Sequence, residues 1–141
     1  MHLDRTEAMA RATTADHGVL ATLNRTGAAD LVPACFALLE GWLVIPIDAI
    51  KPKGSTALGR VRNLERDPRA TLLLEHWDRD DWSHLWWVRL SVVRAEPATE
   101  LAGRLEQALR GRYPQYATTT FAALLAFRVE AVSGWAAASG S

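Results

Sequence analysis

The sequence predicts a mainly β domain of the α+β class, with six antiparallel strands and about three flanking helices. Apolar segments follow one another across short turns, which is the pattern of hairpins rather than of strands alternating with helices. Helical patterns interrupt this series at three places: near the start, in the middle and before the last strand. This order favours an antiparallel barrel with helices over its openings and argues against a doubly wound parallel sheet.

The first half of the chain predicts one helix and three strands. Residues 1–15 form the N-terminal helix segment, because Asp4 and Glu7 have the spacing of a capping box. Three short apolar segments follow, separated by turns rich in Asn, Gly and Thr or by Glu-Gly. We expect them to form an antiparallel meander of strands at residues 18–23, 31–39 and 42–47.

The second half predicts two helices and three more strands. Ser55 or Thr56 caps a helix that places apolar residues on one face and ends at Asp67 and Pro68. A second helix begins near Pro97, with leucines at four-residue spacing. We expect strands at residues 70–77, 85–95 and 121–135, the first of them buried on both faces, and a flexible tail at residues 137–141.

Length and composition limit the classes of function. A chain of 141 residues, 49% apolar and 23% charged, is expected to fold as a single domain over residues 1–141. The formal net charge of zero argues against a nucleic-acid partner, and there is no apolar run long enough to cross a membrane. The N-terminus lacks the apolar block of a signal peptide, and a single cysteine suits a reducing compartment, so we expect a cytoplasmic protein.

One loop in the middle of the chain has the character of an anion site. Lys51 and Lys53 are the only lysines in the sequence, and they flank Pro52 just before the predicted start of a helix. The unpaired amides and the dipole at a helix N-terminus favour an anion. We therefore interpret the loop as a phosphate seat, and the alternative is a solvated basic loop.

The order of elements, together with residues 17–22 (HGVLAT) and 31–36 (LVPACF), resembles the split β-barrel superfamily typified by pyridoxamine 5′-phosphate oxidase. Three central motifs look like its branch of deazaflavin (coenzyme F420)-dependent oxidoreductases: KPK at 51–53, RVRNL at 60–64 and DPRATLL at 67–73. The segment WSHLWWVR resembles an actinobacterial subgroup of that branch. The resemblance implies a six-stranded, FMN-binding type of split barrel that forms a homodimer.

The resemblance also implies a cofactor groove between the subunits. Lys51, Lys53 and Arg60 match the positions where the family places cations on the cofactor phosphate, and Asn63 lies one turn further on. The strand that carries the ring-side contacts would contribute Val32, Pro33 and Ala34.

Further cofactor contacts are implied from two other strands. The end of the third strand leads to the phosphate through Pro46 and Asp48. The partner subunit would contribute Trp86, Trp87 and Arg89 from the fifth strand. Trp77 is a further candidate for the wall of the pocket, although large aromatics most often fill cores and interfaces.

The sequence contains no nucleophile motif, phosphate loop or zinc-protease motif. The acidic and histidine residues at 76–84 match no ligand spacing, so we expect no metal, and we expect Cys35 to be a small apolar strand residue. The absence of a nucleophile motif fits an enzyme whose chemistry is supplied by a cofactor. The sequence therefore predicts an F420-dependent oxidoreductase acting on a small electron-poor molecule. Two alternatives remain: an FMN-dependent enzyme of the same fold, and a non-catalytic barrel that binds a cofactor or haem.

Overall fold

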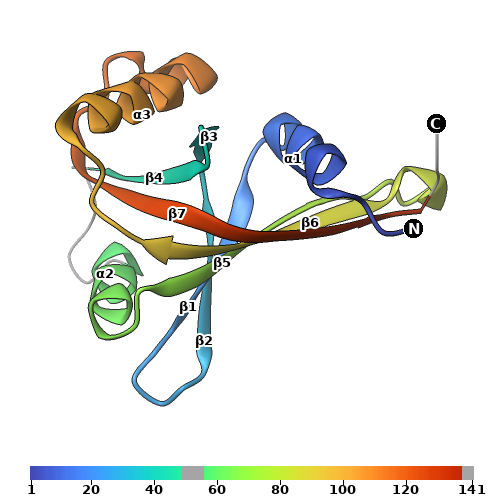
Figure 1. Ribbon diagram of the computed structural model, residues 1–141, viewed down its shortest axis with the longest axis horizontal. Helices are drawn as coiled ribbons and strands as arrows, with labels where there is room; N and C mark the ends of the chain where they lie inside the picture. The colour runs from blue at the N-terminus through green and yellow to red at the C-terminus, as the bar shows by residue number, and fades with distance from the viewer. Residues whose placement is uncertain (49–55, 138–141) are drawn as a thin grey trace.

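Seven antiparallel strands form one curled sheet in the computed structural model, which describes residues 1–48 and 56–137 (Figure 1). Their order across the sheet is β2-β1-β5-β6-β7-β4-β3, and every pairing is antiparallel. The strands are β1 Gly18–Leu23, β2 Ala29–Ala34, β3 Ala37–Leu39, β4 Trp42–Asp48, β5 Arg69–His76, β6 Trp86–Arg94 and β7 Phe121–Ala136. The prediction of a mainly antiparallel β fold with three helices is confirmed.

The expected count of six strands is wrong, because residues 31–39 do not form one strand. The chain changes partners there, so that β2 pairs with β1 while β3 pairs with β4. At the break, the backbone of Phe36 bonds to a side chain instead of a neighbouring strand. Its N–H donates to the Tyr113 hydroxyl at 3.1 Å, and the same hydroxyl lies 3.1 Å from its carbonyl oxygen. The corner is therefore held by a residue far along the chain.

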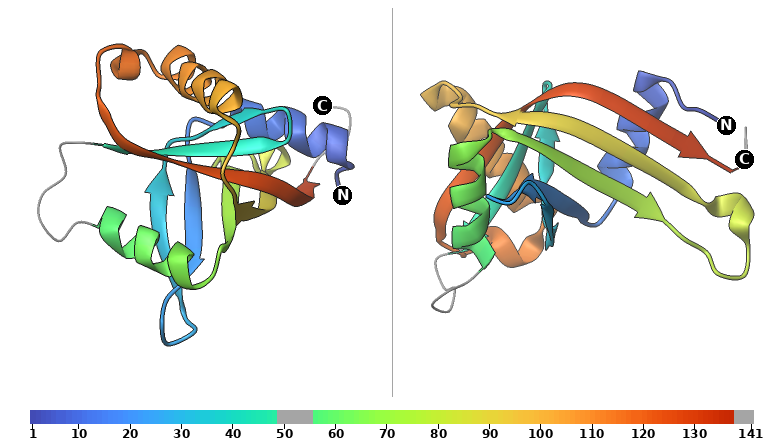
Figure 2. Two further views of the ribbon diagram at one scale, coloured as in Figure 1. Left: turned by 60° about the vertical axis from the view of Figure 1, so that its left-hand side comes forward. Right: turned by 90° about the horizontal axis from the view of Figure 1, so that it is seen from below.

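Three helices cover different parts of the sheet: α1 Arg5–Thr14, α2 Thr56–Arg66 and α3 Thr99–Arg112. The main core lies on the inner face of the sheet and includes Leu20, Leu72, Leu90 and Phe127. A smaller cluster joins α3 to β4 through Leu105, Leu109 and Val44. Helix α2 packs beside β1, where the β1–β2 hairpin begins (Figure 2).

Strands β5, β6 and β7 extend beyond the rest of the sheet as a long arm, with the N-terminus and the end of β7 near its far end (Figure 1). Side chains along the arm alternate between a buried and an outer face, as expected for β6. The expectation that β5 is buried on both faces is wrong at Leu73, which is 37% exposed. Leu73 lies opposite Val19 of β1 and Arg89 of β6, on an outer face that no described helix covers.

Candidate functional site

A pocket of about 480 Å³ lies between β2 and α2. Its volume is within the range of roughly 300–1,000 Å³ that is usual for small-molecule sites. Strand β2 supplies Ala29, the carboxylate-bearing Asp30, the half-buried Val32 and Leu31, which is 67% exposed. Helix α2 supplies Gly59 and the buried Arg60, which is 9% exposed. The pocket thus combines a surface for a planar apolar group with a buried cation.

The floor beside this pocket is a polar network centred on Asn63. Its buried amide nitrogen donates to the Thr22 hydroxyl at 3.0 Å and to an Asp30 carboxylate oxygen at 2.9 Å. Its carbonyl oxygen accepts a hydrogen bond of 2.6 Å from Arg66. These contacts hold α2 against the β1–β2 hairpin, and the expected contact of Asn63 with a cofactor stays a prediction.

Asp30 is held ionised by this network. Its other carboxylate oxygen accepts a hydrogen bond of 2.9 Å from the side chain of Asn24. The amides of Asn24 and then Asn63, with the nearby charge of Arg66, lower the pKa of the Asp30 carboxyl. Two neutral amides, rather than the arginines nearby, therefore donate the hydrogen bonds that the Asp30 carboxylate accepts.

A second pocket, of about 290 Å³, lies on the other side of Gly59. It is lined by Gly59 together with Asn24, Arg25, Arg62, Asn63 and Arg66. Three of these side chains are guanidinium groups, and no carboxylate lines the pocket. The sequence interpretation passed over Arg25, Arg62 and Arg66, although the spacing of Arg62 and Arg66 by four residues on one helix face was an available signal.

The remaining residues predicted for the cofactor on this side are dispersed. Pro33 is exposed on β2, and Ala34 is buried in the core at the end of that strand. Pro46 is buried in β4 opposite Leu124. The backbone of Asp48 ends β4, and Lys51 and Lys53 lie outside the described residues.

The aromatic and basic residues of the arm lie away from the two pockets. Trp86 is buried in the core of its own chain and stacks on His76, with ring centroids 6.3 Å apart. Trp87 and Arg89 lie on the outer face, where the guanidinium sits 4.9 Å from the ring centroid. Trp77 is 58% exposed in the β5–β6 loop and packs edge-on against Trp82. None of them lines the pocket beside β2 within its own chain.

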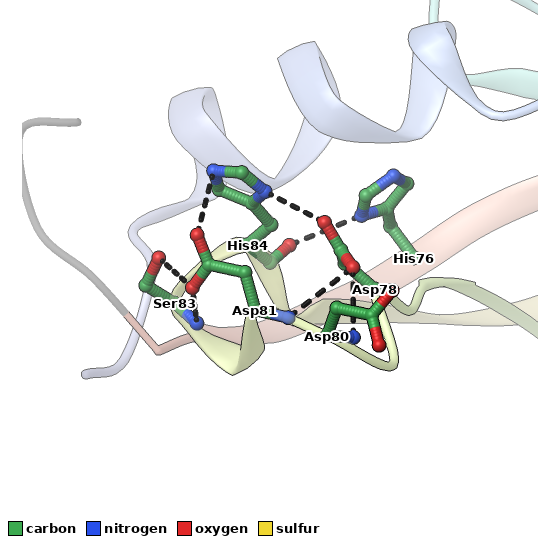
Figure 3. A network of polar contacts seen from close by, with 6 residues as sticks. All are labelled: His76, Asp78, Asp80, Asp81, Ser83 and His84. Carbon is green, nitrogen blue, oxygen red and sulfur yellow. Dashed lines mark hydrogen bonds and ion pairs between the residues drawn. The ribbon is translucent and has the colours of Figure 1, made fainter.

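The polar side chains of the acidic loop between β5 and β6 form a cluster in which they contact one another (Figure 3). The His84 ring lies 3.2 Å from an Asp78 carboxylate oxygen and 3.6 Å from one of Asp81. Hydrogen bonds from the Asp80 N–H and the His84 ring lower the pKa of Asp78, and the Ser83 hydroxyl and N–H lower the pKa of Asp81. Within residues 1–48 and 56–137, no group of three or more His, Cys, Asp or Glu side chains is arranged to hold a metal ion. The cluster shapes the loop around a short 3-10 turn, Trp82–His84.

Comparison with known proteins extends the fold assignment. No family model and no curated protein matches the sequence. A heme binding protein from Mycobacterium smegmatis matches with a TM-score of 0.71 and 22% identity over 96% of this chain. The match covers 54% of that protein, so this chain spans about half of its length.

Two flavin-binding proteins also match in structure. An FMN-binding protein from Syntrophomonas wolfei has a TM-score of 0.67 and 13% identity, over 92% of this chain and 86% of that one. A FAD-binding protein from Mesorhizobium loti has a TM-score of 0.63 and 16% identity, over 95% and 93% of the two chains. At these identities the matches establish the fold, which is the split-barrel fold of the pyridoxamine 5′-phosphate oxidase-like proteins.

No helix among the described residues is long and apolar enough to span a membrane.

Proposed function

We propose that this protein is a cytoplasmic oxidoreductase that uses coenzyme F420 and a small electron-poor organic substrate. The single observation that carries the proposal is the pocket between β2 and α2. There, Leu31 and Val32 of β2 and the buried Arg60 of α2 line one space, together with Ala29, Asp30 and Gly59. A planar ring with a phosphate-bearing tail has these two requirements: an apolar surface and a cation away from bulk water. The structural matches to flavin-binding proteins support a ligand of this shape.

The chain's residues would bind and orient the cofactor rather than react with it. Val32 would pack against the ring, and Arg60 would neutralise the phosphate. Lys51 and Lys53, outside the described residues, would add two cations to the same phosphate. When bound, F420 supplies a hydride from its central ring carbon, and solvent supplies the proton that completes reduction of the substrate.

We further propose that two copies associate through the outer face of the sheet. Leu31 and Leu73 are both exposed large apolar residues on this face, on β2 and β5. An uncovered apolar sheet face is typical of a protein interface. In such a dimer, Trp87 and Arg89 would approach the pocket of the partner, as the family resemblance implies.

Two alternatives keep the fold and change the ligand. FMN has a terminal phosphate and a flat ring, so the same pocket suits it equally. A haem carrier is favoured by the match to a heme binding protein and by a pocket that contains His17 and His76. That pocket has a volume of about 210 Å³, below the usual range of small-molecule sites, so we place the flavin-type ligand first.

The test begins with an absorbance spectrum of the protein as purified, followed by titration with F420, FMN and haem. We expect saturable F420 binding, and turnover of a model enone or a reducible dye with reduced F420. Tight FMN binding with no F420 binding would move the proposal to the FMN alternative. Binding of a cofactor without turnover across a broad substrate panel would favour a carrier.

A further inference from the structure

The pocket lined by Arg25, Arg62 and Arg66 concentrates positive charge in a chain with no net charge. Among the described residues, no ion pair within 4.0 Å involves any of these three side chains. The three exposed arginines line one pocket, so an anion in it would be attracted by all three guanidinium groups. The geometry therefore favours a negatively charged occupant.

The arginines are carried by a braced framework. The Asn24 side-chain oxygen accepts hydrogen bonds from the Thr26 N–H at 3.0 Å and the Ala28 N–H at 3.2 Å, which fixes the turn that holds Arg25. Asn63 fixes α2 against the same hairpin, and its contact with Arg66 orients that side chain. Such bracing lowers the entropy cost of binding, because the cationic groups stand on elements that are already fixed.

The two pockets meet at Gly59, which lines both of them. Apart from its chain neighbours and the backbone of its own helix, no described atom lies within 4 Å of the position where a Cβ would stand on this residue. Gly59 itself therefore places no side chain at the junction of the two pockets. Arg60 lies on one side of this junction, and Arg25, Arg62 and Arg66 lie on the other.

We propose that the three-arginine pocket binds a second anionic group, a phosphate or carboxylate that lies beyond the first phosphate of the bound cofactor. The inference rests on the proposed function, because it extends the ligand of the first pocket across Gly59. It assigns the site to cofactors with an extended anionic tail. A ligand that ends at a single phosphate, such as FMN, reaches only the first pocket.

The test compares ligands that differ in their tails. The double substitution Arg25→Ala/Arg62→Ala removes two cations and spares Arg66, which contacts Asn63. A matched control is Arg5→Ala/Arg79→Ala, which makes the same charge change at exposed sites outside both pockets. Fluorescence titrations with FMN and with F420, which carries carboxylates beyond its phosphate, would measure each dissociation constant. A third variant, Gly59→Leu, places a side chain at the junction.

We expect the Arg25→Ala/Arg62→Ala variant to bind F420 roughly tenfold more weakly or worse, which corresponds to the loss of at least one charge-assisted contact. Its affinity for FMN should fall by less than about threefold. Gly59→Leu should weaken F420 more than FMN, and the control should change neither. Equal losses for the two ligands, or no loss for F420 relative to the control, would overturn the proposal.

A separate arm tests the pocket if no flavin-type cofactor binds. Inorganic pyrophosphate is titrated into the wild-type protein while the backbone amide signals of Gly59 and Arg62 are followed by NMR. We expect saturable shifts that disappear in the Arg25→Ala/Arg62→Ala variant and persist in the control. Failure of the cofactor titrations together with success here removes the proposed function and leaves the anion site standing. Failure to see saturable shifts in the wild type removes the site itself.

Discussion

The side-chain nitrogen of Asn63 on α2 lies 2.9 Å from a carboxylate oxygen of Asp30 on β2, and this contact joins the helix to the hairpin. The same nitrogen reaches Thr22 on β1 at 3.0 Å. Arg60 lies three residues before Asn63 on the same helix, and Arg66 lies three residues after it. The position of Asn63 therefore sets the positions of the cations in both pockets.

Replacing Asn63 by alanine should destabilise the fold. The change leaves a buried hydroxyl, a carboxylate and a guanidinium without their present partner, and we expect a loss of about 2–3 kcal/mol in the free energy of unfolding. Urea denaturation measures it. Glu65→Ala, an exposed change on the same helix, should stay within about 0.5 kcal/mol of the wild type. Equal stability of the two variants would show that the network carries no net stabilisation.

The turn that ends α2 should make stability depend on pH. Arg69 donates to both carboxylate oxygens of Asp67, and this lowers the pKa of Asp67 to about 2. The unfolded value is about 3.9, so the stabilising contribution is complete above about pH 4 and is lost as the pH falls through about 2. The urea midpoints of the wild type and Asp67→Asn should differ above pH 4 and converge toward pH 2. In an Arg69→Ala background this pH-dependent difference should become smaller, since only the backbone N–H of residue 69 still donates to Asp67.

Two glycines should respond in opposite directions to alanine. A Cβ on Gly18 would stand 2.6 Å from a Leu74 methyl carbon and 2.9 Å from the Leu73 carbonyl oxygen, and the backbone atom cannot move freely. We expect Gly18→Ala to cost about 1–3 kcal/mol. Gly103 lies inside α3, and apart from its chain neighbours and the backbone of its own helix no described atom lies within 4 Å of its Cβ position. Gly103→Ala should therefore add about 0.4–1 kcal/mol to the free energy of unfolding. Thermal unfolding of both variants checks the signs, and a stabilised Gly18→Ala protein would contradict the close approach.

Local patterns were enough to predict much of the fold. The apolar run of β1 and the alternation of Trp86, Val88 and Leu90 in β6 depend on neighbouring residues and the two-residue period of a strand. The break at Phe36 could not be found this way, because its partner Tyr113 lies 77 residues away. The same holds for Asn63, whose partner Thr22 is 41 residues distant. Sequence predicted both Arg60 and Asn63 as cofactor contacts, but only the fold shows that Asn63 also braces α2 against the β1–β2 hairpin.

The loop before α2 gives a prediction that rests on sequence. Lys51→Ala/Lys53→Ala should weaken cofactor binding by about 2–4 kcal/mol, because each lysine would supply a charge-assisted contact to the phosphate. F420 and FMN should be affected alike, since both carry that phosphate. Fluorescence titration measures the change, with Arg5→Ala/Arg79→Ala as the charge-matched control. Unchanged affinity in a folded variant would show that the two lysines belong to a solvated loop and do not bind the phosphate.

The outer face of the sheet provides a test of the proposed dimer. Leu73 is 37% exposed at the centre of that face, with Arg89 directly opposite on β6. In a single copy, Leu73→Glu should be tolerated, because the new carboxylate remains in contact with water and faces a guanidinium. In a dimer built on this face, the carboxylate would be buried against an apolar partner and would weaken association. Light scattering coupled to size-exclusion chromatography should report a dimer for the wild type and for Ala10→Glu on exposed α1, and a monomer for Leu73→Glu. A Leu73→Glu protein that remains dimeric would show that the interface lies on another face. Trp87 and Arg89 would then make no contribution to the partner's pocket through this face.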